Sequence, residues 1–240
     1  MKTTIFSGLL ALLIVSCKPA EIAINPQLNA QAMSVKGRNG FLIGQKIKYG
    51  VYHTDKVQRG WTQGYDVPFM LRFQGAKEKL RFKQYGPEGI SAEVSCVSKF
   101  KNVELPILGE FFGIPLDYRN FFAGNIRVGD AYWDFILHNP NGDFLREKKS
   151  AGMARYGDHV IEINAVRGLK NQPEWMKDLT VFGHEFSING KVIGAVSTVN
   201  RGTVWIDESL DATHKTVLAA LATGILLRTD VEGVDMQAAR

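Results

Sequence analysis

THKTVLAALATGILLRTD, residues 213–230, is the stretch that decides the fold of this chain. Its apolar and small residues cover every direction of a helical wheel, which predicts a helix that protein encloses on all sides. These residues are Val217, Leu218, Ala219, Ala220, Leu221, Ala222, Ile225, Leu226 and Leu227. Asp211 is placed to cap the start of the helix, and Arg228 to interact with its far end. The apolar run is shorter than the roughly 20 residues that cross a bilayer.

The segments before this helix have the pattern of β-strands. About ten short segments rich in β-branched and aromatic residues follow one another, without the alternation of strand and helix that builds a parallel sheet. In KLRFKQY (79–85), the alternation predicts a half-buried strand with Leu80 and Phe82 on one face and Arg81 and Lys83 on the other.

A closed barrel with the helix along its axis would satisfy both patterns. Asn189-Gly190 supports an antiparallel arrangement, because both residues tolerate the positive φ of a two-residue hairpin. We therefore expect a mainly β fold over residues 38–230, an antiparallel closed barrel wrapped around the C-terminal hydrophobic helix, followed by a tail at 231–240. The segment Glu104–Asn125 breaks the strand pattern, and we expect a loop insertion or a short helix there, either buried or exposed as an apolar binding patch.

The first residues, MKTTIFSGLLALLIVSC (1–17), have the features of a secretory signal. Lys2 precedes a short apolar run, and a small residue, Ser16, stands before Cys17. The four residues 14–17 resemble a bacterial lipobox. That resemblance implies cleavage of residues 1–16 and acylation of Cys17, and Lys18, in place of the aspartate that marks inner-membrane retention, favours the periplasmic face of the outer membrane. The alternative is an ordinary leader that is cut a few residues later.

Residues 17–37 show no sustained periodicity and contain two prolines, so we expect a lipidated tether between the anchor and the domain. Two or three acyl chains would hold such a chain on the membrane durably. Cys96 is the only other cysteine, and we expect it half-buried in a strand. If Cys17 carries lipid, Cys96 has no partner for a disulfide or for a zinc site.

The end of the chain, GHEFSINGKVIGAVSTVNRGTVWIDESLDATHKTVLAALATGILLRTD (183–230), resembles the end of a tubby C-terminal-like domain, in the branches of the LURP-one-related proteins and the phospholipid scramblases. The resemblance implies a barrel of about twelve strands around a central hydrophobic helix and a scaffold that mostly binds rather than catalyses. The calcium-binding and cysteine-rich features of scramblases have no counterpart here, and no binding residue is carried over from the family.

Composition and spacing offer little chemistry. The net charge of +5 and the 45% hydrophobic residues are ordinary for a globular protein, and we find no nucleic-acid-binding motif. The histidines lack any metal-binding or catalytic spacing, so we expect no catalytic residue, no metal and no cofactor. Histidine occurs at His53, His138, His159, His184 and His214.

One basic cluster is a candidate contact for anionic lipid headgroups: Lys77, Lys79, Arg81 and Lys83. The alternative is a surface strand on which lysines discourage aggregation. We therefore expect a membrane-anchored, non-enzymatic binding or envelope-structural protein, whose partners are the membrane itself and lipid or envelope proteins, with no nucleic acid. A carrier of lipid or another small apolar ligand in the barrel, and an envelope hydrolase, are the alternatives.

Overall fold

The computed structural model describes residues 20–38, 44–60, 78–98, 121–138, 150–173 and 181–238. These residues form one sheet of 13 strands, a short 3₁₀ helix η1 (Pro87–Gly89) and the helix α4 (Ala212–Ala238). The strands are β1 (Met33–Ser34), β2 (Lys48–Tyr49), β3 (Tyr52–Thr54), β4 (Gln58–Arg59), β5 (Glu78–Tyr85), β6 (Ser91–Ser98), β7 (Phe121–Val128), β8 (Ala131–His138), β9 (Ser150–Tyr156), β10 (His159–Val166), β11 (Gly183–Ile188), β12 (Lys191–Ser197) and β13 (Thr203–Ile206).

The sheet curls into a barrel whose two edges meet. Neighbouring strands are antiparallel in the order β1-β13-β12-β11-β10-β9-β8-β7-β6-β5-β3-β2, and β4 also pairs with β5. Met33 of β1 lies opposite Val204 of β13, and just after β1 the backbone of Lys36 forms a bridge with Lys48 of β2. The predicted antiparallel barrel is confirmed.

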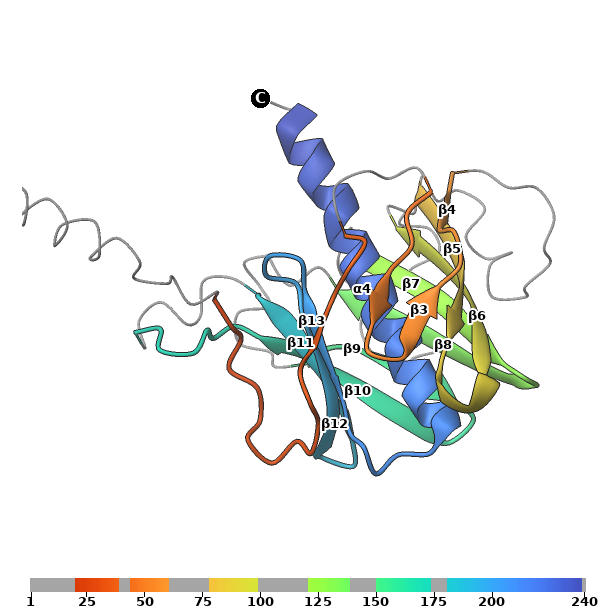
Figure 1. Cartoon of the computed structure of the whole chain (residues 1–240), viewed down its shortest axis with the longest axis horizontal. Coiled ribbons are helices and arrows are strands. Elements are labelled where there is room, and N and C mark those ends of the chain that lie inside the picture. The colour runs from red at the N-terminus through yellow and green to blue at the C-terminus, as the bar shows by residue number, and fades with distance from the viewer. Residues whose placement is uncertain are drawn as a thin grey trace, which may run out of the picture.

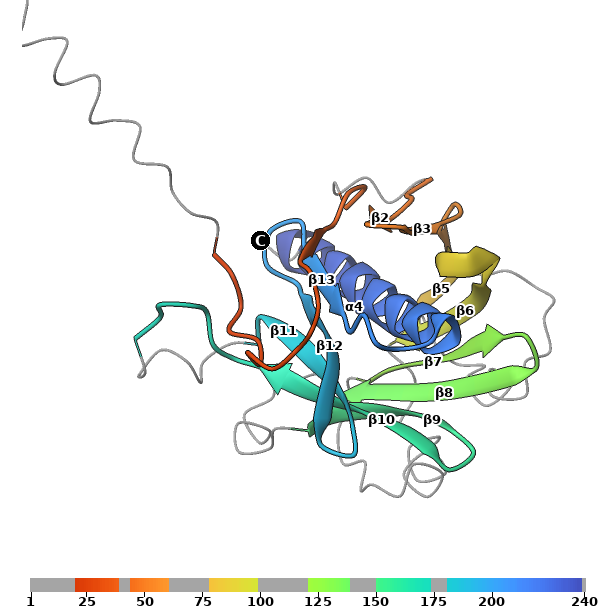
Figure 2. The ribbon, with the colours of Figure 1, turned by 60° about the horizontal axis from the view of Figure 1, so that its bottom comes forward.

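Helix α4 occupies the interior of this barrel. Every one of the nine apolar and small residues that predicted an enclosed helix is buried, none with more than 2% of its surface exposed. Figure 2 shows strands on all sides of α4, with β2 and β3 on one flank and β7 and β8 on the other. The N–H of His214 donates to Asp211 Oδ1 at 2.9 Å, so Asp211 caps the helix as expected.

The far end of the helix differs from the prediction. Arg228 does not lie at its end, because the backbone stays helical to Ala238, through the region expected to be a separate tail. Figure 1 shows this last part of α4 extending past the strands. None of the helices in the described ranges is both long enough and apolar enough to span a bilayer.

A buried chain of hydrogen bonds fixes the helix to the wall. The hydroxyl of Tyr49 lies 2.8 Å from the carbonyl oxygen of Ala219 and 2.9 Å from Thr223 Oγ1, and Thr223 Oγ1 donates to Gln84 Oε1 at 2.7 Å. Burial raises the pKa of Tyr49, so its hydroxyl keeps its proton. These bonds satisfy polar groups inside the barrel and connect α4 with β2 and β5.

The two ends of the barrel are built differently. One end, which we call the turn end, joins β5 to β6, β7 to β8, β9 to β10 and β11 to β12 through residues 86–90, 129–130, 157–158 and 189–190. The opposite end, the loop end, is where the long connections 60–77, 99–120, 139–149 and 167–182 leave the strands. Helix α4 begins at the turn end, with Thr216 against Gly86, and points toward the loop end, where Arg228 lies 5.8 Å from the ring of Phe122.

The expected tether at 17–37 is wrong for its described part. Residues 20–36, which we call the N-terminal strap, cross the outer face of β11–β13 and end in β1. Ile22 is fully buried and forms a bridge with Leu169, and the N–H of Asn25 donates to Glu185 Oε1 at 2.6 Å. The strap belongs to the domain, because its apolar residues cover an outer face of the barrel that would otherwise be exposed.

Of the segment Glu104–Asn125, only 121–125 is described, and these residues belong to β7 rather than to a loop or a helix. Phe122 is buried against Phe135 in the barrel interior. Gly124 leaves room for the same ring, since a Cβ at this position would lie 2.6 Å from Phe135. The hairpin at Asn189-Gly190 is confirmed, with φ of 50° and 78°.

Candidate functional site

Strand β5 presents the predicted basic residues on its outer face. Leu80, Phe82 and Gln84 are buried inside the barrel, and Lys79, Arg81 and Lys83 alternate with them on the outside, as the sequence pattern indicated. Lys77 lies outside the described residues. The candidate contacts that can be placed therefore share one face of a single strand.

Neighbouring strands continue this face as a row of side chains. The backbones of Lys36 and Lys48 exchange hydrogen bonds of 2.8 and 3.0 Å, so the two lysines are directly opposite each other. Lys48 pairs in register with His53, and His53 pairs with Tyr85 of β5, on whose ring it stacks at 4.8 Å between centroids. No described carboxylate forms an ion pair with Lys36 or Lys48. Like charges opposite each other destabilise a sheet, so the fold does not by itself favour this pair.

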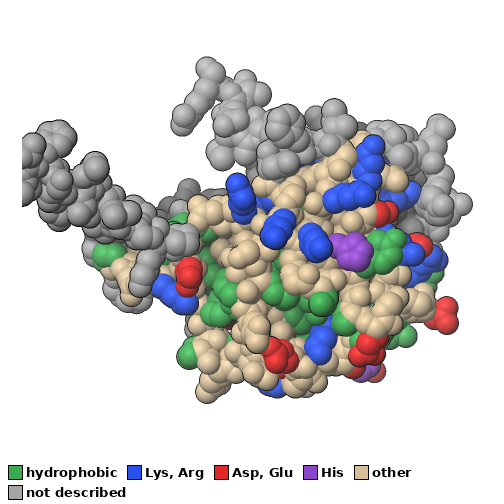
Figure 3. Space-filling model, in the orientation of Figure 1, with side chains coloured by type: hydrophobic (Ala, Val, Ile, Leu, Met, Phe, Trp, Pro, Cys, Tyr) green, Lys and Arg blue, Asp and Glu red, His purple; other side chains and the backbone are tan. Residues whose placement is uncertain are grey.

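The outward basic side chains of β2, β5 and the segments beside them form what we call the cationic wall: Lys36, Lys46, Lys48, Lys56, Lys79, Arg81 and Lys83. Lys and Arg side chains gather on this side of the molecule, over β2 to β5 (Figure 3). Among the carboxylates of the same segments, Asp55 accepts a hydrogen bond from the backbone N–H of Lys83 at 2.8 Å. Positive charge therefore dominates this surface.

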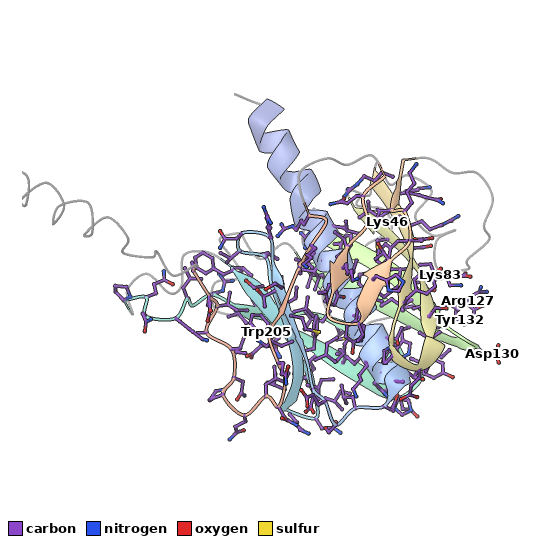
Figure 4. The ribbon with its side chains drawn as sticks, viewed as in Figure 1. Lys46, Lys83, Arg127, Asp130, Tyr132 and Trp205 are labelled. Atoms are coloured by element: carbon purple, nitrogen blue, oxygen red, sulfur yellow. The ribbon has the colours of Figure 1, made fainter. Side chains whose placement is uncertain are left out.

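A shallow hollow of about 400 Å³ borders the wall. It is lined by Asp55, Gln58, Arg81, Phe82, Lys83, Glu93, Ser95 and Arg127. Arg127 forms an exposed ion pair with Glu93 at 2.7 Å, and a hydrogen bond to Tyr132 together with this pairing raises its pKa, so the guanidinium stays charged. Figure 4 shows Lys46, Lys83 and Arg127 on the same flank of the barrel, away from Trp205. Such cations suit a phosphate, sulfate or carboxylate group.

Neither a reactive cysteine nor a metal-binding cluster is present among the described residues. Cys96 is fully buried rather than half-buried, and burial raises the pKa of its thiol, so it stays protonated and unreactive. It is the only cysteine in the described ranges, and Cys17 lies outside them. Within the same ranges no three His, Cys, Asp or Glu side chains come close enough to hold a metal ion.

His184 lies inside the barrel near the loop end, and neither of its ring nitrogens has a hydrogen-bond partner. Burial, assisted by the charge of Arg228, lowers the pKa of His184 to about 3, so the ring is neutral. Ser187, on the same strand, instead accepts a hydrogen bond from Asn164 and donates to Glu162. His184 and Ser187 therefore do not form a hydrogen-bonded pair.

The alternation within one segment predicted the β5 cluster. Four further lysines of the wall are brought beside it only by the register of β2 and β3 and of the segments that adjoin them: Lys36, Lys46, Lys48 and Lys56. The distribution of charge carried a usable signal. Residues 36–83 hold 11 of the 29 Lys and Arg residues but 3 of the 24 Asp and Glu residues, so the positive excess of the chain arises in this stretch.

Comparison with known proteins identifies no relative: no family model, no curated protein and no solved structure matches this chain.

Proposed function

We propose that this chain is a lipid-anchored, non-enzymatic binding protein of the bacterial cell envelope, with the periplasmic face of the outer membrane as its location, whose cationic wall binds an anionic surface or polymer. The main support for the proposal is the cationic wall, and above all the Lys36–Lys48 pair. Backbone hydrogen bonds hold these two lysines opposite each other, and no described carboxylate forms an ion pair with either of them. A bound anion would offset the repulsion between these lysines. The lipobox-like residues 14–17 support the anchor.

The filled interior supports binding at the surface over carriage inside the barrel. A carrier of lipid or another apolar ligand needs a cavity, with the C-terminal helix outside as a lid, whereas α4 takes up the interior and its apolar residues are buried there. In the hollow beside the wall, Asp55 accepts a backbone hydrogen bond and Glu93 is paired with Arg127. Carboxylates engaged in this way favour electrostatic binding over the acid–base chemistry of a hydrolase.

A tubby C-terminal-like domain is our proposal for the family of the barrel. It is supported by the resemblance of residues 183–230 and by the presence of an apolar helix inside an antiparallel barrel, the architecture that the resemblance implies.

The wall is tested by the salt concentration that elutes the detergent-solubilised, full-length chain from immobilised dextran sulfate. Lys36→Gln/Lys48→Gln removes two charges from the wall, and Lys191→Gln/Lys215→Gln removes two from the turn end. We expect the first variant to elute at clearly lower salt and the second to elute close to the unchanged chain, because local charge determines binding. Equal elution of the two variants would show that only net charge matters and would overturn the wall as a site.

The anchor is tested separately by mass spectrometry of the N-terminal peptide from envelope-purified protein. We expect residues 1–16 to be absent and Cys17 to carry a diacylglyceryl group. An unmodified Cys17, or cleavage at another bond, would reject the lipid anchor.

A further inference from the structure

The strap leaves only a short stretch of chain between the barrel and the proposed anchor. The N–H of Lys170 donates to the carbonyl oxygen of Glu21 at 2.8 Å, and the two side chains form an ion pair of the same length. Ile22 is fully buried, and the N–H of Ala23 donates to Gly168 at 2.9 Å. The chain is thus fixed from residue 21 onward. Only three residues separate Cys17 from Glu21, and the four Cα–Cα steps between them span at most about 14 Å when fully extended.

This attachment lies at the loop end of the barrel. Gly168 and Lys170 follow β10, and Ile22 lies against Gly183, the first residue of β11. A tether of this length, much shorter than the expected 17–37 segment, cannot place the turn end against the membrane, because the barrel lies between them. The loop end must lie close to any bilayer that holds Cys17.

The described connections at the two ends have opposite charge. Those at the loop end carry Lys36, Arg38, Lys46, Arg167, Lys170 and Arg201, with Glu21 as the carboxylate. Those at the turn end carry only carboxylates: Glu88, Asp130, Asp158, Asp207, Glu208 and Asp211.

Other charged residues at both ends reduce this asymmetry without reversing it. At the turn end, Lys191 and Lys215 lie beside the six carboxylates, close to Asp207 and Glu208. By sequence, α4 beyond Arg228 carries Asp230, Glu232 and Asp235, which leaves cations in excess over carboxylates at this end. The connections outside the described ranges hold basic and acidic residues in nearly equal number. Charge is therefore unevenly distributed along the barrel axis, and the more positive end is the one nearest the proposed anchor.

We propose that the barrel docks with its loop end, and with the adjoining part of the cationic wall, on an anionic phospholipid surface, the same bilayer that holds its anchor. The inference rests on the proposed lipid anchor and adds an orientation and a ligand to it. The acyl chains would keep the protein on the bilayer, and the basic surface would then favour the approach of the loop end to anionic headgroups. The acidic turn end faces away from the bilayer and presents η1 and the hairpin turns to the aqueous phase.

The orientation is measured with one reporter at each end of the lipidated, full-length chain. Ser34→Cys lies on exposed backbone beside the first residue of β13 at the loop end, and Asp158→Cys lies in an exposed turn at the turn end. Cys96 is buried and does not compete for a fluorescent label. In vesicles of phosphatidylcholine and phosphatidylglycerol at 3:1 (about 25% anionic lipid), a headgroup-located quencher should quench the label at residue 34 several-fold more strongly than the label at residue 158. Equal quenching, or stronger quenching at 158, overturns the proposal.

A second variant separates the contribution of charge from that of the tether. About ten Gly and Ser residues inserted between Lys18 and Pro19 lengthen the tether by up to roughly 35 Å. At this length the tether no longer restricts which end of the barrel can approach the membrane. We expect the quenching difference to persist on the anionic vesicles and to disappear on pure phosphatidylcholine. If it disappears on both lipids, charge plays no part and the anionic-surface claim is wrong.

Flotation of the vesicles keeps this test distinct from that of the proposed function. A chain that does not float with either vesicle lacks the anchor, which rejects the proposed function. A chain that floats but shows no difference between its two reporters retains the anchor and rejects the orientation.

Discussion

Two outer faces of the same barrel differ in what covers them. Over β11–β13, the outward residues Ala195 and Trp205 are buried, because Ile22 and Leu28 of the strap pack on them. Over β2–β5, most outward positions are basic and only the inward ones are buried. The composition of both faces thus has a cause outside the barrel core. One is covered by the chain's own N-terminal segment, and the other is left open and charged, which is what a binding surface requires.

The largest effect is expected for Trp205→Ala, on the covered face. The change empties a space between strap and barrel, and we expect it to lower the free energy of unfolding by about 3–5 kcal/mol. On the open face, Lys48→Ala should change it by no more than about 0.5 kcal/mol. Denaturant unfolding of both variants measures the contrast. A loss below 1 kcal/mol in Trp205→Ala would mean that the strap does not pack as described.

A pH dependence comes next in size, and it arises inside the barrel, at His184. Because the pKa of His184 is lowered in the folded state, the unfolded chain binds the proton more tightly, and stability falls as pH drops below about 6.5 toward about 3. Between pH 7 and pH 5 this histidine should account for a loss of about 2 kcal/mol, which His184→Leu should remove. Val51→Ala, at an exposed position between β2 and β3, changes no titratable group and is the control, so it should leave the pH profile in place. If the stability of His184→Leu depends on pH as strongly as that of the unchanged chain, His184 is not the source of this dependence.

The smallest expected effect is a gain in stability on the open face. Lys48→Glu converts the like-charged pair with Lys36 into an attractive one, and we expect unfolding to become harder by about 0.2–1 kcal/mol in low salt. The same charge change at Lys191, whose ammonium lies 3.4 Å from Asp207, should have the opposite sign. Both effects should shrink in 0.5 M salt. Destabilisation by Lys48→Glu would show that the lysines do not repel each other.

The sequence predicted structure best where the pattern of a single short segment determines its conformation. The helix at 213–230 was predictable because its apolar residues leave no polar face, and the hairpin at Asn189-Gly190 because two adjacent residues set the turn. Strand β9 was missed, since Ser150–Tyr156 is rich in small residues. Gly152 explains why small residues are needed there, as a Cβ at this position would lie 2.1 Å from the carbonyl oxygen of Ile136.

The strap and the full extent of the cationic wall could not be predicted for a different reason. Ile22 and Leu28 show no periodicity, and their burial depends on partners far along the chain, such as Trp205 and Leu169. The Lys36–Lys48 pairing likewise depends on where the barrel closes. Interactions between distant segments leave no trace in local spacing, so the sequence indicated the core and one strand of the candidate site but not the surface that joins them.

The way the barrel closes also constrains when it can form. Strand β1 leaves the ribosome early, yet it pairs with β13, and α4, which fills the interior, comes after both. No N-terminal fragment of the chain can enclose a core, so native packing must await nearly the entire polypeptide and involves contacts of high sequence separation. A nascent chain of this topology therefore lacks its enclosed core until β13 and α4 have been synthesised.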